Sequence, residues 1–159
     1  MAILEIRLEG DEILTKKSKL VENFDKKLHI LLNDMQETMY KSKGIGLAAP
    51  QVGKLRRVII IDIGDGLIEA INPEIVESSG EQKSMEGCLS LPGEMGIVMR
   101  PRIIKIKAQN RFGEKIELFG NGMRSNAFSH EIDHLNGVLF KTKVISGNIN
   151  LFKKKDKSS

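Results

Sequence analysis

The five residues HEIDH at positions 130–134 lie inside a stretch, residues 123–135, whose composition favours a helix. Side chains four residues apart share one face of an α-helix, so the imidazoles of His130 and His134 can reach a single ion. Glu131, beside the first histidine, is then placed to accept a proton from water activated by that ion. The segment predicts a metal-dependent hydrolase, and the competing interpretation is two surface histidines one turn apart.

A divalent ion at such a segment needs a third protein ligand. The sequence after His134 offers none of the usual ones. Phe140 stands where a metzincin protease would place a further histidine, and Asp156, in a basic tail, is the only acidic residue downstream. The third ligand is therefore expected upstream of the helix.

Two upstream side chains are candidates for that ligand. His29 lies on the polar side of a predicted helix, where a surface histidine is the ordinary interpretation. Cys88 is the only cysteine, so no intramolecular disulfide is possible, and it follows a glycine that allows close backbone approach. A lone cysteine is more often a small buried residue than a functional one. A thiolate with two imidazoles, however, leaves one position open, as catalytic sites do.

Hydrophobic periodicity predicts a second helix and several strands. Apolar residues recur three and four apart over residues 24–41, which indicates an amphipathic helix capped by Asn23 or Asp25. Strand patterns cover five stretches, with a break at Asn72-Pro73 and a hairpin at Gly113: residues 57–63, 67–71, 74–77, 103–108 and 115–119. These elements predict an α+β fold, with mostly antiparallel sheets around the central metal-binding helix and one N-terminal helix.

Length and composition suit one globular domain over residues 1–159, because no repeat or linker divides the chain. No apolar run approaches the ~18 residues of a membrane span, and the N-terminus lacks a signal-peptide layout, so an intracellular location is expected. The charge of +4 is mostly interspersed. The lysine-rich tail from about residue 153 is expected to be disordered, or to make weak contact with a polyanion such as RNA.

Residues 44–51, GIGLAAPQ, contain the Gly-x-Gly-x-x-Ala pattern of dinucleotide-binding folds. Their context argues against that function, because a helix precedes the glycines where a strand is needed and Pro50 interrupts the helix that should follow. One interpretation is an ordinary turn between a helix and a strand. The other is a loop whose backbone approaches a substrate and which carries the polar side chain of Gln51.

Three segments taken together resemble the peptide deformylase family in order and spacing: GIGLAAPQ at 44–51, EGCLS at 86–90 and HEIDH at 130–134. The resemblance covers about the first 145 residues, including Asn72-Pro73 and Arg100-Pro101. It implies a bacterial, cytoplasmic hydrolase of protein biosynthesis. Such an enzyme removes the formyl group from the N-terminal formyl-methionine of newly made polypeptides.

The resemblance also implies a role for individual residues. Cys88, His130 and His134 would bind the metal, with Fe(II) as the native ion and Zn(II) or Ni(II) able to replace it. Glu131 would be the general base and then the acid that protonates the leaving amine. The side-chain amide of Gln51 and the backbone N–H of Leu89 would stabilise the oxyanion. The substrate would be bound by the backbone near Ile45 and Gly46 and by a methionine pocket of Ile45, Glu86 and Met123, near Asn126 and Ala127.

Two other functions compete with deformylation. A metallopeptidase of the HExxH type, cutting internal peptide bonds, is disfavoured by the missing downstream ligand. A non-catalytic protein with a structural metal would need neither Glu131 nor Gln51. The sequence departs from the resemblance at Ser129, usually glutamine, at Asn126, and in its short C-terminal end.

Overall fold

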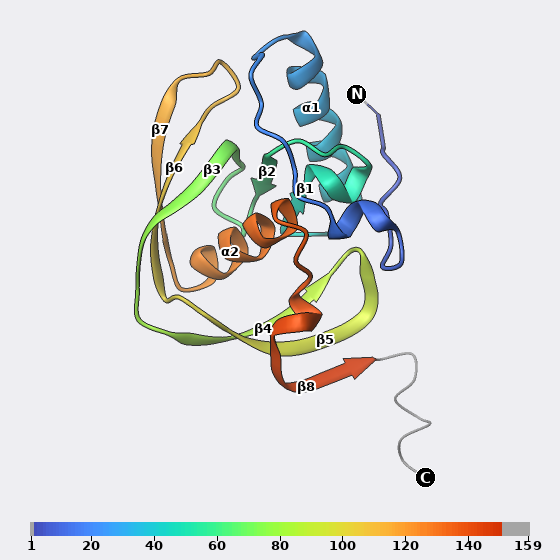
Figure 1. The fold of residues 1–159 in the computed structure, drawn as a ribbon, viewed down its shortest axis with the longest axis vertical. Coiled ribbons are helices and arrows are strands. Elements are labelled where there is room, and N and C mark those ends of the chain that lie inside the picture. Colours follow the sequence, from blue (N-terminus) through green and yellow to red (C-terminus); the bar gives the residue numbers. More distant parts are fainter. Residues whose placement is uncertain (1, 151–159) are drawn as a thin grey trace.

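Two helices and eight strands form most of the computed structural model, which describes the backbone of residues 2–150 and the side chains of residues 2–145 (Figure 1). The helices are α1 (Lys26–Lys41) and α2 (Met123–Leu135), with short 3-10 turns η1 (Glu12–Thr15), η2 (Ala49–Val52) and η3 (Phe140–Lys143). The strands are β1 (Gly46–Ala48), β2 (Val58–Ile61), β3 (Ile68–Ser79), β4 (Gln82–Cys88), β5 (Leu91–Arg100), β6 (Ile103–Gln109), β7 (Lys115–Asn121) and β8 (Val144–Asn150). The lysine-rich tail predicted from about residue 153 lies outside the described residues.

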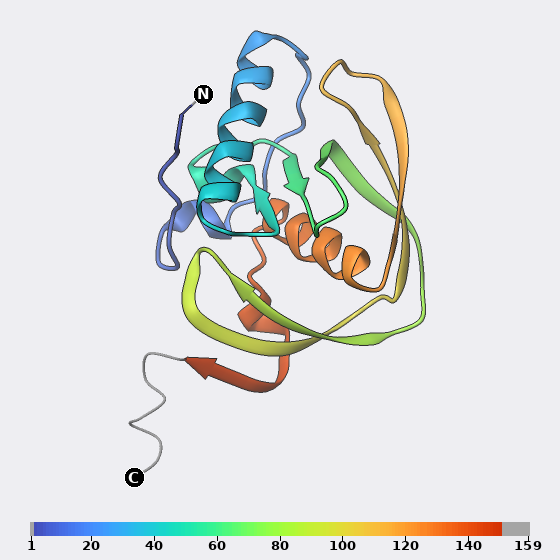
Figure 2. The same ribbon diagram turned by 180° about the vertical axis from the view of Figure 1, so that it is seen from behind.

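The strands form two sheets, and every strand pair in them is antiparallel. Five strands follow the order β1-β2-β3-β6-β7, and three follow the order β4-β5-β8. Helix α2 contacts strands of both sheets and lies between them in opposite views (Figures 1 and 2). The predicted α+β fold, with antiparallel sheets around the helix that carries HEIDH, is confirmed. Of the helices in the described part, none is long and apolar enough to span a membrane.

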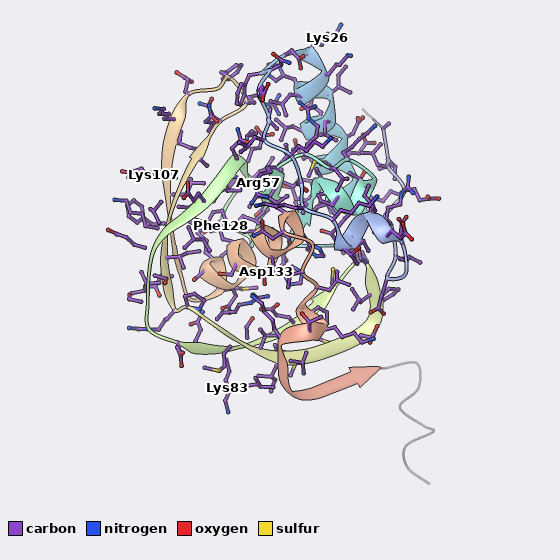
Figure 3. All side chains as sticks on the ribbon, in the orientation of Figure 1. Lys26, Arg57, Lys83, Lys107, Phe128 and Asp133 are labelled. Atoms are coloured by element: carbon purple, nitrogen blue, oxygen red, sulfur yellow. The ribbon has the colours of Figure 1, made fainter. Side chains whose placement is uncertain are left out.

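Strand β2 is apolar on both faces because a helix packs against each face. Val58 and Ile60 belong to the core cluster under α1, whereas Ile59 and Ile61 belong to the cluster under α2. A strand covered on both sides gives a continuous apolar run in the sequence, which is why this strand was predictable. Phe128 of α2 lies among these packed side chains, while Lys83 of β4 projects into solvent (Figure 3).

Both predicted helices are confirmed, and their ends have local causes. Helix α1 begins at Lys26 rather than at residue 24 because the Asp25 side chain accepts a hydrogen bond from the Leu28 amide and caps the helix. Helix α2 has the predicted bounds. Past its end, Gly137 takes a φ of 75°, the left-handed conformation that commonly ends a helix.

The prediction of two strands separated at Asn72-Pro73 is wrong, since β3 continues through both residues. The register between β3 and β6 shifts there, and such an irregularity in the pairing accommodates the missing N–H of proline. Asn72 has a φ of 53°, and its side chain bonds the amide and the carbonyl of Val21. The side chain thus ties this point of the strand to residue 21.

Candidate metal centre

Three possible metal ligands converge where the end of β4 meets helix α2. Cys88 is the last residue of β4, and His130 and His134 stand one turn apart on α2. One ligand atom of each residue lies within 4.8 Å of the others, and Cys88 Sγ is 3.3 Å from His134 Nε2. His29 is held elsewhere, because its Nε2–H donates to the Arg111 carbonyl at 2.8 Å.

The surroundings of the two imidazoles suit a cation at this point. His130 Nδ1 donates to Glu86 Oε1 at 2.8 Å, which leaves Nε2 for an ion. Burial opposes the charged form of His130, but its hydrogen bonds with Cys88 and Glu86 hold its pKa well above the ordinary value. Burial and the charge of His130 lower the pKa of His134 to about 3, so that imidazole is neutral, as a ligand must be. The site therefore stabilises positive charge and offers a neutral nitrogen and a sulfur beside it.

Glu86 is a buried acid whose carboxylate is held by hydrogen bonds from other side chains. Besides His130, the carboxylate accepts hydrogen bonds from the Arg100 guanidinium, and the residue is 6% exposed. Burial disfavours its charged form, yet the bonds from Arg100 and His130 prevail and lower its pKa to about 2. The carboxylate is therefore ionised. It orients His130 through a hydrogen bond and is not itself a candidate metal ligand.

Glu131 is a buried acid whose environment suits a general base. It is 5% exposed, and its Oε1 has no hydrogen-bond partner among the described residues. Burial raises its pKa to about 7, against the opposing charge of His130. A group with a pKa near neutrality can both take up and release a proton.

Gly46 leaves the space that the Glu131 carboxylate occupies. A Cβ atom at residue 46 would overlap Oε2 of Glu131 and lie 3.0 Å from its Cδ. The second glycine of GIGLAAPQ is therefore required by the acid that packs against it. Sequence patterns gave no sign of this contact between β1 and α2.

The side-chain amide of Gln51 is held in one orientation. Its Oε1 accepts from the Ala48 amide at 2.9 Å, so its Nε2 points toward Cys88 Sγ at 3.4 Å and Ser90 Oγ at 3.1 Å. Gln51 is 1% exposed. Leu89 directly follows Cys88, the residue at which the register between β4 and β5 shifts. A fixed N–H donor thus stands beside the candidate metal ligands.

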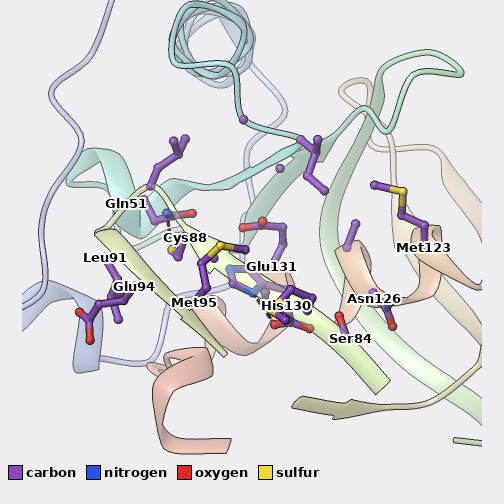
Figure 4. A pocket seen from close by; sticks show the side chains of 18 of the residues that line it. Gln51, Ser84, Cys88, Leu91, Glu94, Met95, Met123, Asn126, His130 and Glu131 are labelled. Carbon is purple, nitrogen blue, oxygen red and sulfur yellow. Dashed lines mark hydrogen bonds and ion pairs between the residues drawn. The ribbon is translucent and has the colours of Figure 1, made fainter. Parts of the chain in front are cut away.

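These residues line a cavity of about 490 Å³ that runs along α2. Figure 4 shows Gln51 and Cys88 toward one end, Met123 and Asn126 toward the other, and His130 and Glu131 between them. Ile45, Gly46, Glu86, Leu89 and Met123 are all among the lining residues. The structure thus brings every residue for which a site role was predicted to one cavity or, for His134, to its edge.

Two strands at the ends of their sheets, β1 and β4, face this cavity. The carbonyl of Ile45 accepts from the Asp62 amide beside β2, and Gly46 pairs opposite Ile61. Because hydrogen-bonding directions alternate along an antiparallel strand, the backbone N–H and C=O of Gly46 point away from β2. The cavity therefore presents backbone groups that an extended chain can pair with.

Two polar residues of the site, Ser90 and Arg100, received no predicted role. Ser90 is fully buried, and its Oγ accepts a hydrogen bond from the side-chain amide of Gln51. Arg100 is 3% exposed and donates to the carboxylate of Glu86. The sequence patterns do not predict β4 or β5, so they could not pair Arg100 with Glu86. The one available signal was Arg100-Pro101, which is part of the resemblance.

Comparison with known proteins shows to which family the chain belongs. The family model described as polypeptide deformylase matches residues 3–148. Peptide deformylase of Acetivibrio thermocellus is 57% identical over 145 residues, covering 91% of this chain and 85% of the relative. That of Alkaliphilus metalliredigens is 54% identical over 145 residues, covering 91% and 99%. The crystal structure of peptide deformylase from Thermotoga maritima has a TM-score of 0.90 at 41% identity and covers 92% of this chain and 100% of its own. This chain belongs to the polypeptide deformylase family.

Proposed function

We propose that this chain hydrolyses the formamide bond of polypeptides that begin with formyl-methionine, releasing formate and a free N-terminal amine. Membership of the polypeptide deformylase family supports this reaction. The observation that carries it is a buried carboxylate, Glu131, standing beside three convergent ligand side chains and the oriented amide of Gln51. The HExxH metallopeptidase alternative finds no support among the relatives, which are named peptide deformylases.

We propose Cys88, His130 and His134 as the ligands of one divalent ion, with Fe(II) as the native ion and Zn(II) or Ni(II) as substitutes. The environment that stabilises positive charge at their meeting point supports this assignment. When bound, the ion supplies Lewis acidity, which polarises a carbonyl and acidifies water. A mixed sulfur and nitrogen ligand set accepts several first-row metals.

Proton transfer is assigned to Glu131, and charge stabilisation to its neighbours. Glu131 accepts a proton from the attacking water and returns it to the amine nitrogen as the C–N bond breaks. The Nε2–H of Gln51 and the backbone N–H of Leu89 donate to the oxygen on which negative charge develops. Removal of one such donor typically costs about 2.7–4 kcal/mol of barrier height.

The cavity has room for the substrate on both sides of this chemistry. The outward-facing backbone of Gly46, beside Ile45, pairs with the peptide as an added strand. The methionine side chain enters the part of the cavity lined by Met123, Asn126 and Ala127, with Glu86 in the wall. Methionine lining suits this role, because an unbranched thioether adapts to an irregular apolar partner.

We further propose that residues 1–159 act as one catalytic domain in a bacterial cytoplasm. Contacts of α2 with both sheets support a single unit over the described part. The bacterial relatives support the bacterial setting. The basic tail is proposed to add weak contact with the ribosome, where formylated chains emerge.

The proposed function is tested by anaerobic purification followed by metal analysis and a formyl-Met-Ala assay on the same sample. We expect about one divalent ion per chain and release of formate in equal amount to free Met-Ala. A sample with one ion that cleaves internal peptide bonds but leaves the formyl group intact would show that the metallopeptidase alternative is right.

Gly46→Ala is expected to lower kcat/KM by about 10²-fold, the cost of a displacement of about 1 Å at a reacting group. The added methyl group occupies the position of the Glu131 carboxylate and must displace it. Metal content is expected to be unchanged, since the three atoms nearest to the added methyl group all belong to Glu131 and none belongs to a ligand.

A double-mutant cycle separates this displacement from any effect on substrate binding. In a Glu131→Gln background the added Gly46→Ala change should cost little, because the side chain that it displaces no longer transfers a proton. Equal losses in both backgrounds would show that residue 46 acts independently of Glu131.

A further inference from the structure

We infer that Arg100 is a positioning residue of the metal centre, which fixes the strand and the helix that carry the ligands relative to each other. The inference rests on the proposed function only in taking Cys88, His130 and His134 as the ligands. It assigns Arg100 no contact with substrate.

The guanidinium of Arg100, at the end of β5, is buried and uses three of its nitrogens on two carboxylates. Nε and Nη2 donate to the two oxygens of Glu86, each at 2.8 Å. Nη1 donates to Asp133 Oδ2 at 2.6 Å. A planar guanidinium matches a carboxylate through two parallel bonds, which sets the rotation of the carboxylate as well as its position.

Through Glu86, the guanidinium sets the orientation of a metal ligand. Oε1 of Glu86 accepts from both Arg100 and His130 Nδ1. Without Arg100, a buried carboxylate would lose its countercharge and would turn or take up a proton. His130 would then lose the acceptor that selects its tautomer and directs Nε2 toward the ion. Phe140 stacks on the same imidazole with ring centroids 6.0 Å apart, so the plane of the ring is supported separately.

Through Asp133, the same guanidinium reaches the helix that carries both histidines. Asp133 lies between His130 and His134 on α2, and Glu86 lies two residues before Cys88 on β4. One side chain thus links the element bearing the sulfur ligand to the element bearing the nitrogen ligands. Lys143 also binds Asp133, at 3.0 Å, but from a more exposed position.

The test measures metal binding rather than activity, in the full chain. Arg100→Met is expected to weaken Zn(II) binding by about 10–100-fold, the usual cost of losing an outer partner of a metal ligand. The visible absorption of the Co(II)-loaded variant is expected to change as well, because His130 reorients. Arg100→Lys keeps the charge but not the paired bonds, so it should fall between this variant and the original chain.

Arg111→Met is the matched control. Arg111 likewise donates through Nε and Nη2 to both oxygens of one carboxylate, Glu69, and also to Asn33, and none of these three residues lines the cavity. Its loss should leave Zn(II) affinity and the Co(II) spectrum unchanged. Thermal unfolding of each metal-free variant, followed by circular dichroism, separates effects on folding from effects on the metal centre.

A folded Arg100→Met protein with the original affinity and spectrum would overturn the inference. If that variant does not fold, Arg100→Lys decides: an altered Co(II) spectrum in a folded protein supports the inference, and an unaltered one rejects it. These outcomes are independent of the reaction. A chain that binds Co(II) normally yet fails to release formate would contradict the proposed function and leave the role of Arg100 standing.

Discussion

Replacement of Glu131 by glutamine is expected to lower kcat for deformylation by about 10²–10⁴-fold while the bound metal is retained, the range that a lost general acid–base group typically costs. Glutamine has nearly the shape of glutamate but cannot accept a proton from water. The pKa of Glu131, near 7, lets this residue act first as base and then as acid, so both proton transfers fail together in the variant. No metal ligand is removed.

The loss is measured as kcat on formyl-Met-Ala, with metal content from the same preparation. We expect Glu131→Gln to unfold at the same temperature as the original chain or higher, because it removes a buried carboxylate whose Oε1 has no hydrogen-bond partner among the described residues. Turnover close to that of the original chain would reject Glu131 as the base. A variant without metal would instead assign Glu131 to metal binding.

The parts of the fold that were predictable are those whose reason is local. Helix α2 has the predicted bounds because a helical pattern ends just before a glycine, and β2 was predictable because helices cover both of its faces. Strand β4 was not predictable, since its buried positions include Ser84 and Glu86. Polar residues at buried positions look like a surface loop until the distant partners that satisfy them are known.

In the candidate site, too, the features with a local cause were predictable and those that depend on distant residues were not. Spacing on one helix predicted His130, Glu131 and His134. The missing downstream ligands left Cys88 and His29 as candidates, and the family resemblance favoured Cys88 and gave Gln51 its role. The bonds that orient these groups join residues far apart in the chain, such as Glu86 with His130 and Gln51 with Cys88. The need for glycine at residue 46 comes from an acid on another element. Single-sequence patterns contain no information about such pairs, because no local periodicity depends on them.

Cys88→Ala is expected to abolish stable metal binding and, with it, deformylation. Two imidazoles on one helix would remain, and the only other histidine, His29, donates to the Arg111 carbonyl away from the site. The loss of affinity should exceed the ~10–100-fold typical of an outer partner, because a direct ligand is removed. Folding is expected to survive, since Cys88 is only half-buried and forms no disulfide.

Two measurements check this prediction on one preparation. Metal content after dialysis should fall to background in Cys88→Ala and stay unchanged in the control His29→Ala. Added Zn(II) at 100 times its dissociation constant stabilises a folded binder by about 2.7 kcal/mol. The unfolding temperature of the original chain and of His29→Ala should therefore rise with Zn(II), whereas that of Cys88→Ala should not. An equal rise in Cys88→Ala would mean that a carboxylate completes the ligand set in place of the thiolate.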